Sequence, residues 1–298
     1  MKLSLVLIIY RSKSTIAKEA SIFCEDLLNN KKISVIKSDS SFKYKSLKSI
    51  LDKNNRLPDL VIVLGGDGTV LKSSNELFNL DIPIISFNIG GNLGFLTHDK
   101  RFLLDKSFID LLEKDEFTID KRTMLECNHN QVNFNEHKKS NITQHYALND
   151  FYFKSIDNDI SPTNQIRIDI NNEKVNEYKG DGLIISSATG STAYSMAAGG
   201  PIVHPLINAF VINAICPMSL SSRPIVIPDT SKVIIKNINK EKRCLQLWKD
   251  GTKCQILNQM EFCEITKAAK PTRMISLRNN ISYYSTLIKK LEWRGNLS

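Results

Sequence analysis

A chain of 298 residues, 42% of them hydrophobic, can bury a sizeable core and is long enough for one large or two ordinary domains. Its formal net charge of +9 suits anionic ligands, but the lysines are scattered and no nucleic-acid recognition motif is present, so we exclude a nucleic-acid partner. No segment approaches the ~20 apolar residues of a membrane span. The apolar run at residues 3–10 lacks a cleavage site and is followed by Arg11 and Lys13, so we expect a buried strand and a cytoplasmic protein without a membrane partner.

Short apolar runs alternate with helical patterns over the first third of the chain. The alternation predicts a doubly wound parallel α/β domain, whose ligands bind beyond the carboxyl ends of the strands. The expected strands are residues 3–9, 33–36, 60–64 and 82–87, and the expected helices are residues 14–30, 42–51, 70–79 and 101–114.

After about residue 117 the chain changes to β-branched, alternating segments separated by turn residues, which predict an antiparallel all-β domain. Residues 128–141 are polar and rich in His, Asn and Lys, so we expect an exposed loop or hairpin there. Residues 283–292 predict an amphipathic helix. The clearest expected strands are residues 166–170, 233–235, 244–248 and 261–266.

The cysteines form neither a C-x-x-C pair nor a zinc-ligand pattern, so we interpret them as reduced core residues. They are Cys24, Cys127, Cys216, Cys244, Cys254 and Cys263.

Residues 60–64 run directly into Gly65-Gly66-Asp67-Gly68-Thr69 and then into a helical pattern. Glycines at a strand-to-helix turn let backbone N–H groups approach a pyrophosphate, and the helix N-terminus favours the negative charge. Asp67 would repel phosphate unless it binds a metal ion or accepts a proton from a hydroxyl, and phosphoryl transfer needs both functions. The alternative is that Asp67 is a helix N-cap in an ordinary tight turn.

This Gly-Gly-Asp-Gly-Thr string resembles the signature shared by NAD kinases, diacylglycerol kinases, sphingosine kinases and, in variant form, phosphofructokinases. The stretch at residues 87–97, with Asn88 and three glycines, resembles the second NAD kinase loop. Asn149-Asp150 resembles the Asn-Glu pair of NAD kinases, which binds the ribose and nicotinamide side of NAD, although Asp stands here where Glu is usual. A plain turn is the alternative for each of the two segments.

The most specific stretch, residues 179–205, closely matches the longest NAD kinase motif. Its glycines, small hydroxyl residues and single aromatic residue suit a ligand groove lined by backbone better than a core. The resemblance implies nucleotide contacts by Asp181 and residues 192–194, with the ring of Tyr194 as a packing face. Lys179 stands where Arg is frequent and would meet phosphate as a point charge.

Two positions depart from the family pattern: Ala197 is commonly Ser, and Thr252 is commonly Gln. Residues 216–220, followed by Arg223-Pro224, resemble a segment that we assign to architecture and subunit packing. The resemblance covers about residues 59–293. The residues for which it implies nucleotide binding are Asp67, Gly68, Lys72, Asn88, Asn149, Asp150, Lys179, Asp181, Thr192, Ala193, Tyr194, Ser195, Ala197 and Thr252; Asp67 is the expected catalytic residue, and no residue is assigned as a metal ligand.

The NAD kinase family implies an α/β domain at residues 1–116, an all-β domain for NAD binding and oligomerisation at residues 117–272, and a segment at residues 273–298 that returns to the first domain. NAD is expected in the cleft between the domains, and ATP as the phosphoryl donor with a divalent metal ion, Mg²⁺. A homo-oligomer, dimer or tetramer, is expected, with sites that borrow residues from a neighbouring subunit. The alternatives are a lipid kinase of the diacylglycerol or sphingosine type and a non-catalytic NAD(P)-binding sensor. A Rossmann dehydrogenase is excluded because G-x-G-x-x-G is absent after the first strand.

Overall fold

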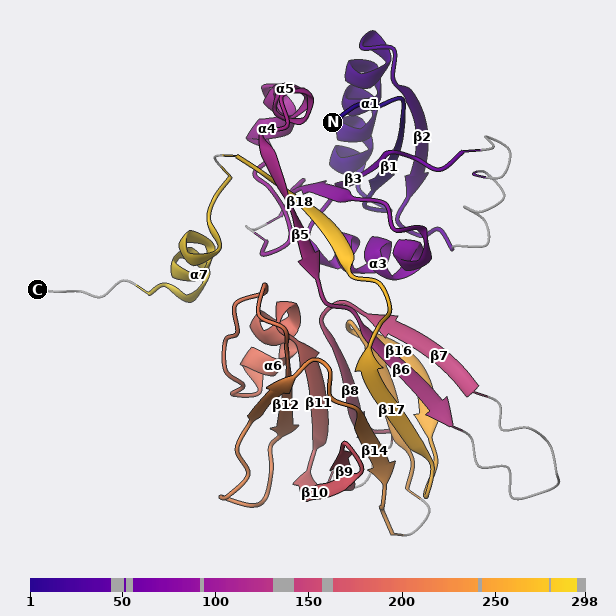
Figure 1. Ribbon diagram of the computed structural model, residues 1–298, viewed down its shortest axis with the longest axis vertical. Helices are drawn as coiled ribbons and strands as arrows, with labels where there is room; N and C mark the ends of the chain where they lie inside the picture. The colour runs from indigo at the N-terminus through magenta and orange to yellow at the C-terminus, as the bar shows by residue number, and fades with distance from the viewer. Residues whose placement is uncertain are drawn as a thin grey trace, which may run out of the picture. The chain divides into compact units, whose positions relative to one another are not determined.

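The computed structural model describes residues 1–43, 51, 56–91, 94–130, 142–156, 163–240, 243–278 and 280–293. The chain folds into two compact units (Figure 1): Met1–Lys121 with Thr272–Ser298, and Arg122–Pro271. The first unit continues past residue 116, the end that we expect from the sequence for its domain, because β5 (Phe117–Arg122) belongs to its sheet.

The first unit contains a six-stranded sheet in the order β2-β1-β3-β4-β18-β5. The pairs β1–β2, β1–β3, β3–β4 and β4–β18 are parallel. β18 comes from the end of the chain and inserts beside β4, so the expected return of the C-terminal segment to this domain is confirmed. The other strands are β1 (Leu5–Tyr10), β2 (Ser34–Asp39), β3 (Leu60–Leu64) and β4 (Ile84–Phe87), with β18 at Thr272–Leu277.

Helices cover both faces of this sheet, as in a doubly wound fold. α1 turns Ala17, Cys24 and Leu28 toward the sheet at helical spacing, and α4 and α5 pack into the same cluster. Strand residues that point the other way are buried too, including Val61 and Val63. The helices are α1 (Thr15–Asn30), α3 (Asp67–Leu77), the 3₁₀ turn η1 (Phe78–Leu80), α4 (Arg101–Leu104), α5 (Ser107–Glu113) and α7 (Tyr283–Leu291).

One helix prediction is wrong in detail: the segment at residues 101–114 forms two helices. Between them, the carboxylate of Asp105 accepts the N–H and the hydroxyl of Ser107 at 3.0 and 2.6 Å, and Lys106 adopts a φ of +66°. An Asp side chain that binds nearby backbone competes with helical hydrogen bonds and breaks the helix. Apart from Phe42, Lys43 and Leu51, the helix expected at residues 42–51 lies outside the described residues.

The second unit contains two six-stranded sheets, and the strand pairs recorded in both are antiparallel, which confirms the predicted all-β domain. One sheet has the order β10-β9-β14-β17-β6-β7, with β10 (Glu173–Gly180), β9 (Asn164–Ile170), β14 (Val233–Asn237), β17 (Phe262–Lys267), β6 (Leu125–Asn130) and β7 (Ile142–Ala147). The other has the order β13-β12-β11-β8-β15-β16, with β13 (Ile225–Pro228), β12 (Ala209–Ile215), β11 (Gly182–Ser187), β8 (Asp150–Ser155), β15 (Leu245–Lys249) and β16 (Thr252–Leu257).

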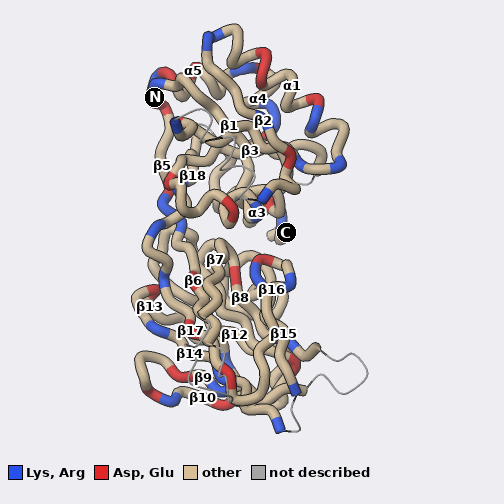
Figure 2. The backbone as a smooth tube through the Cα atoms, turned by 90° about the vertical axis from the view of Figure 1, so that its right-hand side faces the viewer, with Lys and Arg blue, Asp and Glu red and all other residues tan. Residues whose placement is uncertain are grey.

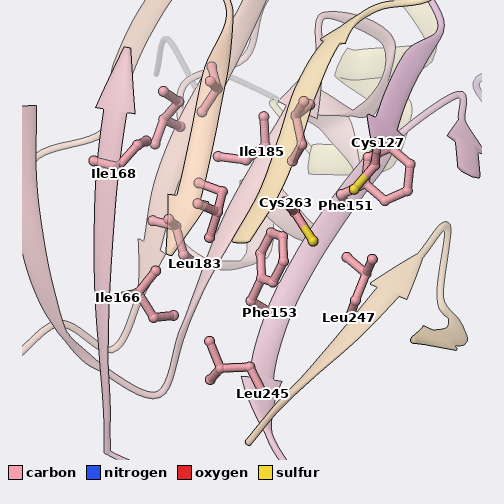
Figure 3. Packing of buried hydrophobic residues seen from close by; sticks show 14 of the residues in the cluster. Cys127, Phe151, Phe153, Ile166, Ile168, Leu183, Ile185, Leu245, Leu247 and Cys263 are labelled. Carbon is pink, nitrogen blue, oxygen red and sulfur yellow. The ribbon is translucent and has the colours of Figure 1, made fainter. Parts of the chain in front are cut away.

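The two sheets of the second unit share one apolar core, in which Phe151 and Phe153 of β8 are fully buried with residues of both sheets (Figure 3). Burial of each such Phe contributes about 1.5–3 kcal/mol. The polar insert expected at residues 128–141 begins inside β6, which ends at Asn130 and pairs with β7; the remainder, residues 131–141, lies outside the described residues.

The outer face of β11 and β12 is covered by the residues that follow β11. The 3₁₀ turn η2 (Thr189–Thr192) and the short helix α6 (Tyr194–Ala197) pack there. The residues of β11 and β12 are therefore all buried, whichever face of the sheet they point to. This segment belongs to the long motif found in the sequence. The motif therefore occupies a face of the second sheet.

All six cysteines are free. Cys24, Cys127 and Cys263 are buried, as expected, but the prediction is wrong for Cys216, which is exposed in a turn with a φ of +45°. Lys and Arg are spread over both units and interspersed with acidic residues (Figure 2). Within the described residues, no helix is both long enough and apolar enough to span a membrane.

Candidate active site

Asp67 lies in the first turn of α3, directly beyond β3. Gly66 is the N-cap of this helix, so the alternative interpretation of Asp67 as the cap residue is wrong. Asp67 Oδ2 accepts the N–H of Phe95 at 2.8 Å, and Oδ1 accepts the N–H of Leu96 at 3.1 Å. Each carboxylate oxygen has a second lone pair, so these bonds fix the group without using up its capacity to accept a proton.

The second loop reaches Asp67 because it folds back on the end of β4. The N–H of Asn88 donates to His98 O at 2.9 Å, and the N–H of His98 donates to Ser86 O at 2.8 Å. Gly90 adopts a φ of +74°, a conformation that favours glycine. The two glycine-rich loops identified in the sequence thus meet within the first unit; Asn92 and Leu93 of the second loop lie outside the described residues.

His98 is a buried residue behind this loop that sequence reasoning missed. Its Nε2 accepts the N–H of Leu277 at 3.1 Å, so Nδ1 carries the proton and donates to Ser86 O at 3.0 Å. Burial lowers the pKa of His98 to about 4, which keeps the ring neutral at pH 7. The ring joins the loop to β18. The sequence carried no signal of this role, because His98 stands among polar residues, between Thr97 and Asp99.

A cavity of about 850 Å³ lies at the carboxyl ends of β1 and β3 in the first unit. From the Gly-rich turn and α3 it is lined by Gly66, Gly68, Thr69 and Lys72, and from the other side by residues 11–16 and Ser40. Gly68 and Lys72, two of the predicted binding residues, therefore face the same space. Its volume lies within the ~300–1,000 Å³ typical of ligand pockets.

In the second unit, the carboxylate of Asp250 holds the turn that presents Asn149 and Asp150. It accepts the N–H groups of Leu148, Asn149 and Asp150 at 2.9, 2.8 and 3.1 Å. Gly190 packs on the backbone of Asn149 so closely that a Cβ would lie 2.6 Å from its Cα. The two motifs, far apart in sequence, are thereby placed in contact.

Asp150 is 3% exposed, and burial, with the nearby charge of Asp250, raises its pKa to about 8. At pH 7 the group is therefore mostly a neutral acid, which can donate a hydrogen bond as well as accept one.

The end of the long motif packs through aromatic rings. The rings of Tyr152 and Tyr194 meet edge to face with centroids 4.8 Å apart, and Tyr152 stacks on Trp248 at 5.6 Å. Thr192, Ala193 and Tyr194 are half-buried.

The remaining residues of this segment differ in accessibility. Ala197 is exposed at the end of α6, whereas Ser195 is fully buried and its hydroxyl lies against Gly200. Asn213, which the sequence did not single out, fixes this turn by donating from Nδ2 to the carbonyls of Ser195 and Ala198, both at 3.0 Å. Thr252 is exposed at the start of β16, two residues after Asp250.

Lys179 and Asp181 do not join the other predicted residues. They lie where β10 meets β11, whereas Asp150 pairs with Ser186 near the opposite end of β11. The six residues of β11 separate its ends by about 17 Å at 3.4 Å per residue. Of the predicted residues, Asp67, Gly68, Lys72 and Asn88 belong to the first unit and the others to the second. Among the described residues, no cluster of three or more His, Cys, Asp or Glu side chains could hold a metal ion.

Phosphoryl transfer needs a carboxylate that can take the proton of the acceptor and positive charge that can meet phosphates. Asp67, in the first turn of α3 beside the cavity lined by Arg11, Lys13 and Lys72, meets both needs, so the class indicated is a phosphoryl-transfer enzyme. Residues 6–117 match the ATP-NAD kinase N-terminal domain, and residues 149–277 match the ATP-NAD kinase C-terminal domain.

Two curated relatives are similar over their full length. NAD kinase 1 of Prochlorococcus marinus subsp. pastoris is 63% identical over 293 residues, which cover 98% of each chain. NAD kinase 1 of Parasynechococcus marenigrum is 38% identical over 309 residues, covering 100% of this chain and 98% of the relative.

Two solved structures share the fold. The yeast NADH kinase complexed with NADH has a TM-score of 0.83 and 23% identity, covering 99% of this chain and 89% of that one. An NAD kinase from Archaeoglobus fulgidus in complex with ATP has a TM-score of 0.71 and 20% identity, covering 98% and 100%. This chain belongs to the ATP-NAD kinase family, and the predicted NAD kinase function is confirmed. None of these relatives favours a lipid kinase or a non-catalytic sensor.

Proposed function

We propose that the protein transfers the terminal phosphoryl group of ATP to the 2′-hydroxyl of the adenosine ribose of NAD, giving NADP. The observation that carries this proposal is the carboxylate of Asp67, held by two backbone N–H groups at the start of α3 and adjacent to residues that line a basic cavity. A pure binding protein has no use for an acid beside phosphates. The relatives are NAD and NADH kinases, and two of them bind NADH and ATP, which agrees with this reaction.

In this mechanism Asp67 accepts the proton of the 2′-hydroxyl as the oxygen attacks the terminal phosphorus of the donor. The P–O bond to the leaving diphosphate breaks, and the diphosphate keeps the electron pair. Backbone N–H groups at the start of α3 stabilise the charge on the phosphoryl oxygens. The bonds from Phe95 and Leu96 keep the carboxylate in place for this proton transfer. The phosphoryl group passes directly between the two substrates, so no covalent bond to the protein is required.

The donor set at Asp67 fits a divalent ion such as Mg²⁺. Mg²⁺ is usually held by one or two carboxylates together with substrate phosphates, and each oxygen of the half-buried Asp67 retains a lone pair. Asp67 would hold the ion together with the phosphates of the donor. When bound, Mg²⁺ neutralises charge that develops on the phosphates.

NAD is proposed to bind to the second unit through Asn149, Asp150 and residues 192–194. Asn149 offers an amide donor and acceptor, and the protonated Asp150 offers a hydroxyl donor to the ribose. The ring of Tyr194, supported by Tyr152, gives a flat apolar face. Ala197 and Thr252, both exposed, are proposed to border the bound dinucleotide.

Lys179 and Asp181 are proposed to serve the site of a neighbouring subunit. Within one chain, the length of β11 separates them from Asn149 and Asp150. Beside them, Met218 and Leu220 are 63% and 91% exposed, and a partner subunit that covered these two apolar side chains would remove them from water. A homo-oligomer, dimer or tetramer, would bring Asp181 of one subunit to the dinucleotide of another.

A cytoplasmic location is also proposed. Thiols stay free in reducing compartments, and the cysteines of this chain, including the exposed Cys216, are unpaired.

The reaction is tested by incubating the purified protein with NAD, ATP and Mg²⁺ and measuring NADP with an NADP-specific dehydrogenase. We expect NADP to form, and we expect the 2′-deoxyadenosine analogue of NAD to inhibit competitively without being phosphorylated. Phosphorylation of this analogue would show that the proposed acceptor hydroxyl is wrong, and no NADP from NAD would reject the proposed function.

The shared site is tested by subunit mixing. Asp67→Asn and Asp181→Asn are each expected to inactivate the enzyme when expressed alone. Co-expressed variants form mixed oligomers in which one site combines an intact Asp67 with an intact Asp181, so we expect about a quarter of wild-type activity for random dimers. If mixing restores no activity, Asp181 does not act across a subunit boundary.

A further inference from the structure

The C-terminal helix α7 lies against the second glycine-rich loop (residues 87–97) within the first unit, although the proposed mechanism gives this helix no role. The rings of Tyr283 and Phe95 have their centroids 6.0 Å apart, with an interplanar angle of 47°. The ammonium group of Lys290 lies over the ring of Phe95, 4.7 Å from its centroid. Two residues of α7 therefore contact one aromatic ring of the loop.

Tyr283 and Lys290 reach the same ring because they are seven residues apart on one helix. Seven residues make almost two turns of an α-helix, so side chains with this spacing lie on one face. The start of the helix is fixed by its cap, since the side chain of Ser282 accepts the N–H of Ser285 at 3.1 Å. The face that meets Phe95 is therefore set by the helix as a whole.

Phe95 is one of the two residues that hold the carboxylate of Asp67. Its N–H donates to Asp67 Oδ2 at 2.8 Å, and the N–H of Leu96 donates to Oδ1 at 3.1 Å. Leu96 is tied to β4, because Ser86 Oγ donates to its carbonyl oxygen. The side chain of Phe95 packs on α7 instead. The two N–H groups at Asp67 are thus supported by two different elements.

The contact with Lys290 depends on the direction of its side chain as well as on its charge. The face of an aromatic ring attracts an ammonium group within about 6 Å of its centroid. Lys289 carries the same charge, but adjacent residues of an α-helix point about 100° apart. Lys289 is exposed and turned away from the face that Tyr283 and Lys290 share, so it provides a matched control.

We propose that Tyr283 and Lys290 are positioning residues for the reaction, which hold the N–H of Phe95 toward Asp67 by packing on the ring of Phe95. Neither side chain touches the reacting atoms. The inference rests on the proposed function, in which Asp67 accepts the proton of the 2′-hydroxyl, and extends it by making turnover depend on the docking of α7. Weak contacts suffice for this role, because misplacement of a catalytic group by about 1 Å can cost ~10²-fold in rate.

The first test compares Tyr283→Ala and Lys290→Ala with the wild type and with Lys289→Ala. We expect kcat to fall about tenfold in Tyr283→Ala. In Lys290→Ala we expect a fall of about twofold to fivefold, the factor for a cation–π contact at an exposed site. The KM values for ATP and NAD should stay within about twofold, because an interaction that acts only in the transition state changes kcat and not binding. Lys289→Ala should keep the wild-type kcat.

Conservative variants separate positioning from the mere presence of these residues. Tyr283→Phe keeps the ring and Lys290→Arg keeps the cation, so both should retain kcat within about twofold of wild type. Melting temperatures show whether each variant is folded. If Tyr283→Ala does not fold, the variants at Lys290 still decide, because replacing an exposed side chain has little effect on stability. Equal kcat values in Lys290→Ala and Lys289→Ala would overturn the inference.

Combination with Asp67→Asn shows whether α7 acts through the carboxylate. Tyr283→Ala and Lys290→Ala should lower kcat when Asp67 is present and have little further effect in Asp67→Asn, because residues that act as a unit are not additive. A further loss of about tenfold from Tyr283→Ala in Asp67→Asn would overturn the inference, since α7 would then act independently of Asp67. The proposed function fails by a different result, a kcat near wild type in Asp67→Asn alone.

Discussion

Gly94 lies directly against the carboxylate of Asp67. A Cβ on Gly94 would overlap Asp67 Oδ1 and would lie 2.8 Å from Asp67 Cγ and 2.6 Å from Thr97 Oγ1. The absence of a side chain at Gly94 therefore lets the N–H groups of Phe95 and Leu96 reach the carboxylate. The second glycine-rich loop thus holds the proposed catalytic base as well as any ligand.

Gly94→Ala is expected to lower kcat by about tenfold to a hundredfold, because misplacement of a catalytic group by about 1 Å can cost ~10²-fold. Gly91→Ala is the matched control, because a Cβ there meets only Asn88 Oδ1, at 3.3 Å. Steady-state kinetics of both variants, together with their melting temperatures, check the prediction. Equal kcat values in the two variants would show that Gly94 does not position Asp67.

Asp67→Asn should fold and bind NAD but should lose about 10²–10⁴ in kcat, the usual range for general acid–base assistance. The amide can satisfy only one of the two N–H donors, so we also expect a small loss of stability, about 1 kcal/mol. Turnover measured beside NAD affinity separates the two effects. A kcat within about threefold of wild type would remove Asp67 from the mechanism.

Asp250→Asn tests whether Asp250 positions the residues proposed to bind NAD. The amide oxygen can replace only one of the carboxylate oxygens that accept from Leu148, Asn149 and Asp150, and the turn should loosen. We expect the KM for NAD to rise about tenfold, equivalent to about 1.4 kcal/mol, with a smaller change in kcat and no change in the KM for ATP. An equal rise for both substrates would indicate general unfolding instead.

The raised pKa of Asp150 predicts how stability depends on pH. The folded value of about 8 exceeds the ordinary 3.8, so between these values the folded state holds a proton that the unfolded state has released. Stability from this group is fully present below about pH 4, falls as the pH rises toward 8 by at most about 1.4 kcal/mol per unit, and then levels off. Urea unfolding between about pH 5 and 8 should show this slope in the wild type and a flatter profile in Asp150→Asn. The control variant Asp26→Asn, in which an exposed carboxylate is removed, should keep the wild-type slope. A wild-type slope that persists in Asp150→Asn would assign the dependence to another group.

Ala197→Ser restores the residue that is common in the family. Ala197 is exposed at the end of α6, so an added hydroxyl need not be buried without a partner. One neutral hydrogen bond is worth about 0.5–1.5 kcal/mol, so the KM for NAD should fall by up to about tenfold with kcat little changed. Steady-state kinetics measure the change in the KM for NAD, and a melting curve measures the stability of the variant. Loss of folding would show that residues 192–197 do not border NAD.

Local sequence was enough to predict many of the strands and helices and the position of the glycine-rich turn. A continuous apolar run followed by Gly65-Gly66-Asp67-Gly68-Thr69 predicts a strand, a tight turn and a helix, because each of these choices depends on neighbouring residues. The same reasoning located the change from α/β to antiparallel texture near residue 117. It also identified Asp67 as an unusual carboxylate within an anion-binding turn, whereas Asn149 and Asp150 were identified by their resemblance to the Asn-Glu pair of NAD kinases.

The tertiary structure decided what touches what. The N–H groups of Phe95 and Leu96 hold Asp67, Gly190 packs on Asn149, and β18 inserts beside β4. Each contact joins residues distant in the chain, and local backbone preference carries no information about which distant partner will be met. For the same reason only the folded chain could place Asp181 at the far end of β11 from Asp150 and bring Arg11 to the cavity beside Lys72.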